Sequence, residues 1–169
     1  SSNHEPFEIP DGRIESYNVP LHTRENAIKY ADHAIGHFFD LARREAYYAD
    51  TVFVVVADHD ARVKGAPLVP VERFRVPALV IGPDVPVGPY DRVASQIDLV
   101  PTLLGLMGIE ATVPTPGRNL LRLPDDDPGR AVMQYGLNHG FRVGNRLVVH
   151  QPQRPAQSFR IEGTALVPI

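Results

Sequence analysis

Residues 51–65 read TVFVVVADHDARVKG, and in this stretch a run of apolar, mostly β-branched residues ends abruptly at Asp58, His59 and Asp60. The run from Thr51 to Ala57 predicts a β-strand. Its unbroken apolar character favours burial on both faces, as in the centre of a mostly parallel sheet. In open α/β sheets, binding groups lie just beyond the carboxyl ends of the strands. Asp58 and His59 are therefore the first candidate site residues.

Helical and strand-like patterns surround this stretch. Apolar residues at spacings of three and four predict an amphipathic helix from residue 25 to about residue 46. A second apolar run at 78–81 predicts another buried strand, and the segment 98–107 predicts a second helix. Ser95, with Asp98 three residues on, fits a capping box at the start of that helix. These patterns together indicate mixed α/β structure.

The last forty residues change to short strand patterns. We expect antiparallel strands at residues 131–135, 141–143, 146–150 and 158–161. Gly144–Asn145 is a two-residue hairpin turn signal between two of them. The predicted fold class is therefore α/β, with a C-terminal antiparallel meander.

Composition limits the possible functions of the chain. Its 169 residues suffice for one domain with a core, and 43% hydrophobic with 22% charged residues is typical of a globular protein. A formal net charge of −3, with no Lys- or Arg-rich run, argues against a nucleic-acid partner, and the absence of Cys excludes disulfides. No apolar stretch is long enough for a membrane helix. The chain opens on Ser1-Ser2-Asn3-His4, so we expect it to be a piece of a longer protein.

Asp58 and His59 are candidate metal ligands. A carboxylate oxygen beside a neutral imidazole nitrogen suits Mn²⁺ or Zn²⁺ better than Mg²⁺. Neighbouring strand residues point to opposite faces, but where a strand ends the backbone can turn both side chains toward one ion. The alternative is that Asp58 caps the following turn and His59 is an ordinary loop residue.

Other polar residues have weaker claims. The His4 imidazole is suited to hold an anionic substrate oxygen, or it is simply a surface histidine. Arg62 and Lys64 follow the Asp-His pair and are candidate binding groups for a phosphate or sulfate, with solvated loop charges as the alternative. His33 and His37 have the spacing for a shared ion on a helix, but they fall on its polar side, which favours a solvated helix face.

A nucleophile is missing from these patterns. The chain has no Gly-x-Ser-x-Gly elbow and no glycine-rich phosphate loop. Thr102 carries the only hydroxyl in a suggestive setting, and the helical pattern accounts for it. His139, between Asn138 and Gly140, is interpreted as a turn residue. We therefore assign no catalytic residue to this chain.

An ordered set of segments carries a family resemblance. These segments are SNHEPF (2–7), NAIKYADHAIGHFF (26–39), VFVVVADHDARVKG (52–65), VPALVIGP (76–83), SQIDLVPTLLGLMGI (95–109) and PGRNL (116–120). Together they resemble the C-terminal half of the catalytic domain of the sulfatase and alkaline-phosphatase superfamily. The likeness is greatest to lipoteichoic-acid-synthase-like phosphoglycerol transferases. An ordered set of this kind is far more specific than any single motif.

The resemblance implies a fold and a domain division. It implies part of an alkaline-phosphatase-like α/β sandwich, with a mostly parallel central sheet and a C-terminal antiparallel meander. Residues 1–123 would form the C-terminal half of the catalytic domain, and residues 124–169 the antiparallel strands of the same domain.

The resemblance also implies a divided site. Asp58 and His59 match a pair of metal ligands, and His4 matches a histidine that touches the phosphate of the substrate. The hydroxyl nucleophile and a further acid come from the N-terminal half of the domain, which has no counterpart here. Mn²⁺ is the favoured ion, with Mg²⁺, Ca²⁺ and Zn²⁺ as alternatives.

The function implied is that of a fragment of a metal-dependent phosphoglycerol-transferase-like or sulfatase-like enzyme acting on a phosphodiester or a sulfate ester. The rivals are a true sulfatase, a phosphoethanolamine-type transferase, and a non-catalytic binding module. Asp60, Ala61 and Arg62 stand where ordinary sulfatases tend to have Gly and Glu, which weakens an arylsulfatase assignment. The parent protein would be membrane-anchored, with this domain outside the cytoplasm, in the periplasm or at the cell surface. By itself the fragment would be inactive and prone to self-association.

Overall fold

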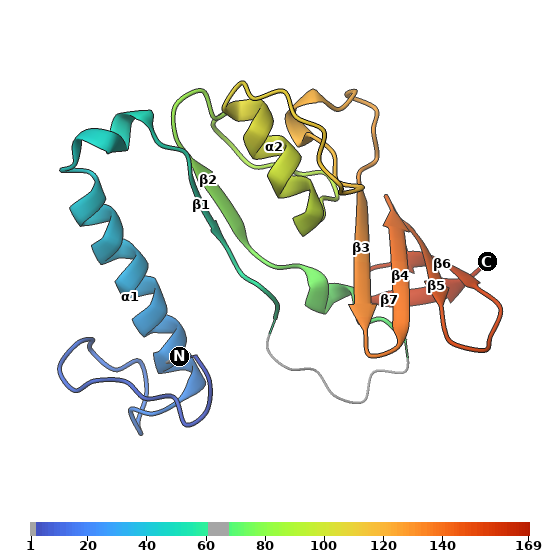
Figure 1. Cartoon of the computed structure of the whole chain (residues 1–169). Helices are drawn as coiled ribbons and strands as arrows, with labels where there is room; N and C mark the ends of the chain where they lie inside the picture. The colour runs from blue at the N-terminus through green and yellow to red at the C-terminus, as the bar shows by residue number, and fades with distance from the viewer. Residues whose placement is uncertain (1–2, 61–67) are drawn as a thin grey trace. The chain divides into compact units, whose positions relative to one another are not determined.

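The computed structural model describes residues 3–60 and 68–169, and the chain divides into two compact units. The first unit is Ser1–Thr51 and the second is Val52–Ile169. Figure 1 labels the helices and strands of both units.

The first unit consists of a loop, the helix α1 (Arg24–Ala42) and the 3-10 helix η1 (Ala46–Asp50). The side chain of Thr23 caps α1 by accepting a hydrogen bond from the backbone N–H of Asn26. Asn26 is fully buried, and its amide nitrogen donates to the carbonyl oxygens of Asn18 (2.8 Å) and Leu21 (2.9 Å). The start of the helix therefore organises the loop before it.

The apolar stripe of α1 is largely exposed. Ile28, Ile35 and Phe38 have exposed fractions of 60%, 40% and 48%, whereas Phe39 is buried. The predicted helix exists, but it ends about four residues earlier than expected and its repeating apolar face is not the buried one. No helix in residues 3–60 and 68–169 combines the length and the apolar character needed to cross a bilayer.

Two short strands open the second unit. β1 (Phe53–Val56) and β2 (Ala78–Ile81) form a two-stranded sheet, with Phe53 opposite Ile81 and Val56 opposite Ala78. The pair is antiparallel, so the expectation that these two apolar runs belong to a parallel arrangement is wrong for this pair. The strands are also only partly buried.

The connection between the strands has no α-helix in the part that the structure describes. A parallel pair needs a crossover, usually an α-helix, that returns the chain to its starting edge. In the part of this connection that the structure describes, the only helical segment is the 3-10 helix η2 (Val71–Phe74). The N–H of Ala57 bonds to the carbonyl oxygen of Pro77 at 3.3 Å, so the chain returns directly beside the strand it left.

A second helical element follows. The 3-10 helix η3 (Gln96–Asp98) leads into α2 (Leu99–Leu106), which confirms the predicted helix. The capping box between Ser95 and Asp98 is formed in both directions. Pro101 lies in the first turn of α2, where its missing N–H is not needed.

The PGRNL segment is hydrogen-bonded to this helix through the buried Asp98. One oxygen of the Asp98 carboxylate accepts from the N–H of Ser95 (2.9 Å), and the other accepts from the N–H of Arg118 (2.7 Å). A β-carbon on Gly117 would lie 1.9 Å from the carbonyl oxygen of Ile97, so only glycine permits this approach. The motif therefore fixes residues 117–120 against η3 and α2, followed by the 3-10 helix η4 (Leu120–Arg122).

The C-terminal meander is confirmed. Five antiparallel strands run in chain order: β3 (Arg130–Tyr135), β4 (Asn138–Val143), β5 (Arg146–His150), β6 (Gln157–Glu162) and β7 (Ala165–Pro168) (Figure 1). The Gly144–Asn145 turn joins β4 to β5 as predicted. His139 lies in β4 and not in a turn, because the chain reverses earlier, before Asn138. The strand β7 has no counterpart among the sequence predictions.

The main core of the second unit belongs to this meander. Met133, Leu147, Val149 and Phe159 are buried together, each on an alternating position of its strand. Val69 from the connection before β2 packs into the same cluster. The meander is thus a stable platform to which the β1–β2 connection is attached.

Candidate functional site

Asp58 and His59 lie just beyond the last residue of β1. The carboxylate oxygen Oδ2 of Asp58 is 3.5 Å from the imidazole nitrogen Nε2 of His59. Both side chains are open to solvent, with 86% of Asp58 and 71% of His59 exposed. The two side chains therefore converge at an accessible strand end, as the sequence predicts, while their role as metal ligands stays a prediction.

Backbone contacts leave one atom of each side chain directed at the other. The Nδ1 atom of His59 is 2.8 Å from the carbonyl oxygen of Asp60, and a carbonyl only accepts hydrogen bonds. In the neutral imidazole Nδ1 therefore carries the proton, which leaves the lone pair of Nε2 facing Asp58. The Oδ1 atom of Asp58 accepts from the N–H of His59 at 2.8 Å, and Oδ2 is the carboxylate oxygen that faces Nε2.

This pair fits a divalent ion as part of a ligand set. Two atoms that each lie about 2.0–2.2 Å from one ion can be at most about 4.4 Å apart, so a separation of 3.5 Å is compatible with sharing one. Within residues 3–60 and 68–169, however, no group of three or more His, Cys, Asp or Glu side chains is placed to hold a metal. If Asp58 and His59 are metal ligands, they would supply two of the three or four protein ligands that catalytic metal sites use.

Two side chains near the pair, those of Arg73 and Gln96, were not predicted from the sequence. The Nη1 atom of Arg73, in η2, is 3.4 Å from Oδ2 of Asp60, which brings a positive charge next to the pair. The amide nitrogen of Gln96 donates to the carbonyl oxygens of Ala57 (2.7 Å) and Asp58 (3.0 Å). Gln96 is 38 residues from Asp58 in sequence. The only sequence feature that could have indicated its importance is its position in SQIDL, one of the segments that carry the family resemblance.

The other candidate site residues lie in the first unit or outside the described residues. His4 is exposed in the loop of the first unit, where its carbonyl oxygen accepts from the N–H of Phe7 at 2.7 Å. His4 and the Asp58 pair belong to different units, so their expected approach stays a prediction. Arg62 and Lys64 lie outside the described residues. His33 and His37 are exposed on α1.

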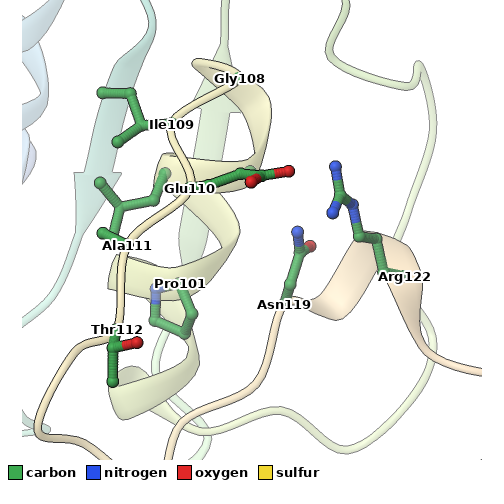
Figure 2. A pocket seen from close by; sticks show the side chains of 10 residues that line it. Pro101, Gly108, Ile109, Glu110, Ala111, Thr112, Asn119 and Arg122 are labelled. Atoms are coloured by element: carbon green, nitrogen blue, oxygen red, sulfur yellow. The ribbon is translucent and has the colours of Figure 1, made fainter.

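A cleft of about 530 Å³ lies elsewhere in the second unit. Its walls are α2 and the segment 109–122, and Figure 2 shows Glu110, Asn119 and Arg122 directing polar groups toward the same space. Neither Asp58 nor His59 lines it. The cleft runs along α2 toward its C-terminal end, whereas Gln96, just before α2, contacts the Asp58 backbone, so the cleft is not the candidate metal site.

The fold defines the class of protein. Over its whole length the chain superposes on 42% of a protein of the alkaline phosphatase superfamily from Vibrio parahaemolyticus, with 45% identity and a TM-score of 0.93. Residues 1–109 match the family model described as Sulfatase, and the chain belongs to that family. The superfamily resemblance read from the sequence is confirmed, and members of this superfamily generally use divalent metal ions.

More distant relatives agree with this assignment. A curated protein named Sulfatase from Formosa agariphila is 26% identical over 136 residues, which is 73% of this chain and 27% of that protein. The crystal structure of Ps i-CgsB shares the fold, with 20% identity, a TM-score of 0.61, and 85% of this chain matched to 37% of that one. The chain therefore spans less than half the length of each of these relatives.

Proposed function

We propose that this chain is the metal-binding part of a sulfatase-family enzyme that cleaves or transfers a phosphate or sulfate ester. The observation that carries the proposal is the pairing of Asp58 Oδ2 with His59 Nε2 at 3.5 Å, beyond the end of an apolar strand. These two atoms would hold a divalent ion, with Mn²⁺ favoured over Mg²⁺, Ca²⁺ and Zn²⁺. When bound, such an ion stabilises the negative charge that builds up on the transferred group.

The other roles follow from the chemistry of an ester. His4 would orient an anionic oxygen of the substrate, and Arg62 and Lys64 would attract its negative charge. A hydroxyl nucleophile and at least one further acid would come from the rest of the catalytic domain. That hydroxyl would form a bond to phosphorus or sulfur while the ester oxygen of the leaving group departs.

The missing remainder of the domain is the partner we propose for this chain. Of the described residues, only β2 pairs with β1, although the two strands are rich in Val, Leu and Ile. Leu79 is 53% exposed and Val56 is 37% exposed. Further strands of the parent domain would pair with these edges and cover these side chains.

A phosphodiester of the phosphoglycerol type is the favoured substrate. The resemblance to phosphoglycerol transferases supports it, and the presence of Asp60, Ala61 and Arg62 in place of the usual Gly and Glu after Asp-His weakens an arylsulfatase assignment. A sulfate ester is the second candidate, supported by the family and by the name of the Formosa agariphila relative. We further propose that the parent protein is membrane-anchored and works outside the cytoplasm.

The test is an assay of the full-length parent protein with Mn²⁺ against an activated phosphodiester and an aryl sulfate. Asp58→Ala should lower Mn²⁺-dependent turnover by at least about 100-fold, because loss of a ligand exceeds the roughly 10–100-fold cost of disturbing outer-shell groups. Asp126→Ala, at an exposed acid in the loop before β3, is the matched control and should leave turnover unchanged.

The pattern of results separates the candidates. Turnover of the phosphodiester supports a transferase or phosphodiesterase, and turnover of the aryl sulfate supports a sulfatase. Phosphoethanolamine release from a lipid donor would support the third enzyme candidate. Mn²⁺ binding without turnover would point to a binding module. Full Mn²⁺-dependent activity in Asp58→Ala would rule out the proposed ligand role.

A further inference from the structure

The side chain of Gln96 holds the backbone on which the candidate metal ligands stand. Its amide nitrogen lies 2.7 Å from the carbonyl oxygen of Ala57 and 3.0 Å from that of Asp58. Carbonyl oxygens only accept, so the NH₂ end of the amide must face them, and both of its hydrogens are used. These two bonds join the end of β1 to η3, an element far away in sequence.

We propose that Gln96 is a positioning residue for the metal pair, an inference that rests on the proposed function. The carbonyl oxygen of Asp58 and the N–H of His59 belong to one planar peptide group. Gln96 holds the oxygen of that group, and the carboxylate of Asp58 accepts from its N–H at 2.8 Å. Fixing this plane sets the directions in which both side chains leave the backbone.

The strand alone does not fix these directions. Successive side chains of a strand point to opposite faces, so two adjacent ligands converge only if the backbone turns where the strand ends. The pairing of β1 with β2 ends at Val56, and the last bond to the neighbouring strand segment is made by Ala57. Gln96 supplies the next restraint, at the position where the turn is required.

Gln96 is itself firmly anchored. Its neighbour Asp98 is fully buried and bonds to the backbone N–H groups of Ser95 and Arg118. Between the two, the carbonyl oxygen of Ile97 packs against Gly117. An amide held by such a rigid support restrains the metal pair more effectively than one on a free loop.

The experiment uses the full-length parent protein and two readouts, one of them without metal. In metal-free protein, Gln96→Ala should speed amide hydrogen exchange across residues 57–60 by about tenfold. In Mn²⁺ titrations followed by calorimetry, the dissociation constant should rise by about tenfold, the lower part of the range for residues that support metal ligands. Activity should recover at saturating Mn²⁺, because both proposed ligands are still present in the variant.

Two further variants provide a second test and a control. Gln96→Glu preserves the shape and places an oxygen against the two carbonyls, so it should weaken Mn²⁺ binding at least as much as Gln96→Ala. Gln134→Glu makes the same change at an exposed strand position and should alter neither readout. If both Gln96 variants bind Mn²⁺ normally while Asp58→Ala does not, Gln96 has no positioning role and the proposed function stands. If Asp58→Ala also binds normally, the proposed function fails and the positioning role with it.

Discussion

Thr102 shows why a hydroxyl in a suggestive setting need not be a nucleophile. It is 7% exposed, and its Oγ1 donates to the carbonyl oxygen of Asp98 at 2.7 Å while accepting from the N–H of Leu120 at 3.0 Å. The hydroxyl thus satisfies the backbone N–H of Leu120 in a partly buried hydrogen bond. Its role in the structure is to connect α2 to η4.

We therefore predict that Thr102→Val lowers the free energy of unfolding by about 1–3 kcal/mol, the cost of leaving the Leu120 N–H unsatisfied. Thr102→Ser keeps the hydroxyl and should lose less than about 1 kcal/mol, from one methyl group. Urea unfolding measures both. Turnover per folded molecule of the full-length protein should be equal in the two variants, and a loss confined to Thr102→Val would reopen the nucleophile interpretation.

A pH-dependent contribution to stability comes from Asp127. Its hydrogen bond to the Arg118 guanidinium (2.7 Å), followed by that to the N–H of Gly129 (2.8 Å), lowers the pKa of the carboxyl from its ordinary value of 3.8. Because the folded-state pKa lies below the unfolded one, the stabilisation is present above pH 3.8 and is lost as the pH falls through the folded pKa.

Asp127→Asn should accordingly unfold at a lower urea concentration than the wild type at pH 7. The difference between the two proteins should shrink progressively below about pH 4. Asp126→Asn, at the exposed neighbouring position, serves as the control and should unfold at the same urea concentration as the wild type, both at pH 7 and below about pH 4. A stability difference between the wild type and Asp127→Asn that grows below about pH 4 would contradict a lowered pKa of Asp127.

At the scale of elements, Gly117 and Gly36 provide a matched pair. A β-carbon on Gly117 would lie 1.9 Å from the Ile97 carbonyl oxygen, whereas one on Gly36 in α1 meets nothing within 4 Å. Gly117→Ala should therefore destabilise by about 3 kcal/mol, the upper part of the range for overpacking. Gly36→Ala should stabilise by about 0.5–1 kcal/mol through helix propensity. Thermal unfolding of both variants measures these effects: the melting temperature should fall for Gly117→Ala and rise for Gly36→Ala.

Local patterns predicted the elements well. The apolar run at 78–81 coincides with β2, and the 98–107 segment contains α2 together with the end of its capping turn. Gly144–Asn145 gave the correct hairpin because a two-residue turn specifies its own register. The strand end before Asp58 and His59 was predicted for a similar reason, since an abrupt change from apolar to polar residues marks the end of a strand.

Features that depend on distant residues could not be predicted in this way. The apolar patterns of β1 and β2 do not specify the direction in which the two strands pair, and the observed pairing is antiparallel. Gln96 contacts the Asp58 backbone across 38 residues, and although the SQIDL segment marks it as part of a family motif, that motif does not specify the contact. The apolar spacing of α1 predicts a helix, but which face is buried depends on what packs against it.

At the scale of the whole molecule, exposed apolar surface is the common feature of both units. In the first unit, Ile28 and Phe38 of α1 are 60% and 48% exposed. In the second, Leu79 of the two-stranded sheet is 53% exposed. Relatives of this chain extend well beyond the part it matches, with 42% of the Vibrio parahaemolyticus protein and 27% of the Formosa agariphila protein covered. We expect the corresponding remainder of the parent domain to cover this surface.

The last prediction is that the 169-residue chain, produced alone, is catalytically silent, binds Mn²⁺ weakly and self-associates. Two protein ligands leave an ion to complete its coordination with water, and a covalent mechanism without its nucleophile retains only electrostatic assistance. Exposed strand edges and apolar side chains favour association between copies. Light scattering should give a mass above 18.7 kDa that rises with concentration, and neither the phosphodiester nor the aryl sulfate should be turned over. Mn²⁺-dependent turnover by the isolated chain that disappears in Asp58→Ala would mean instead that these residues contain a complete site.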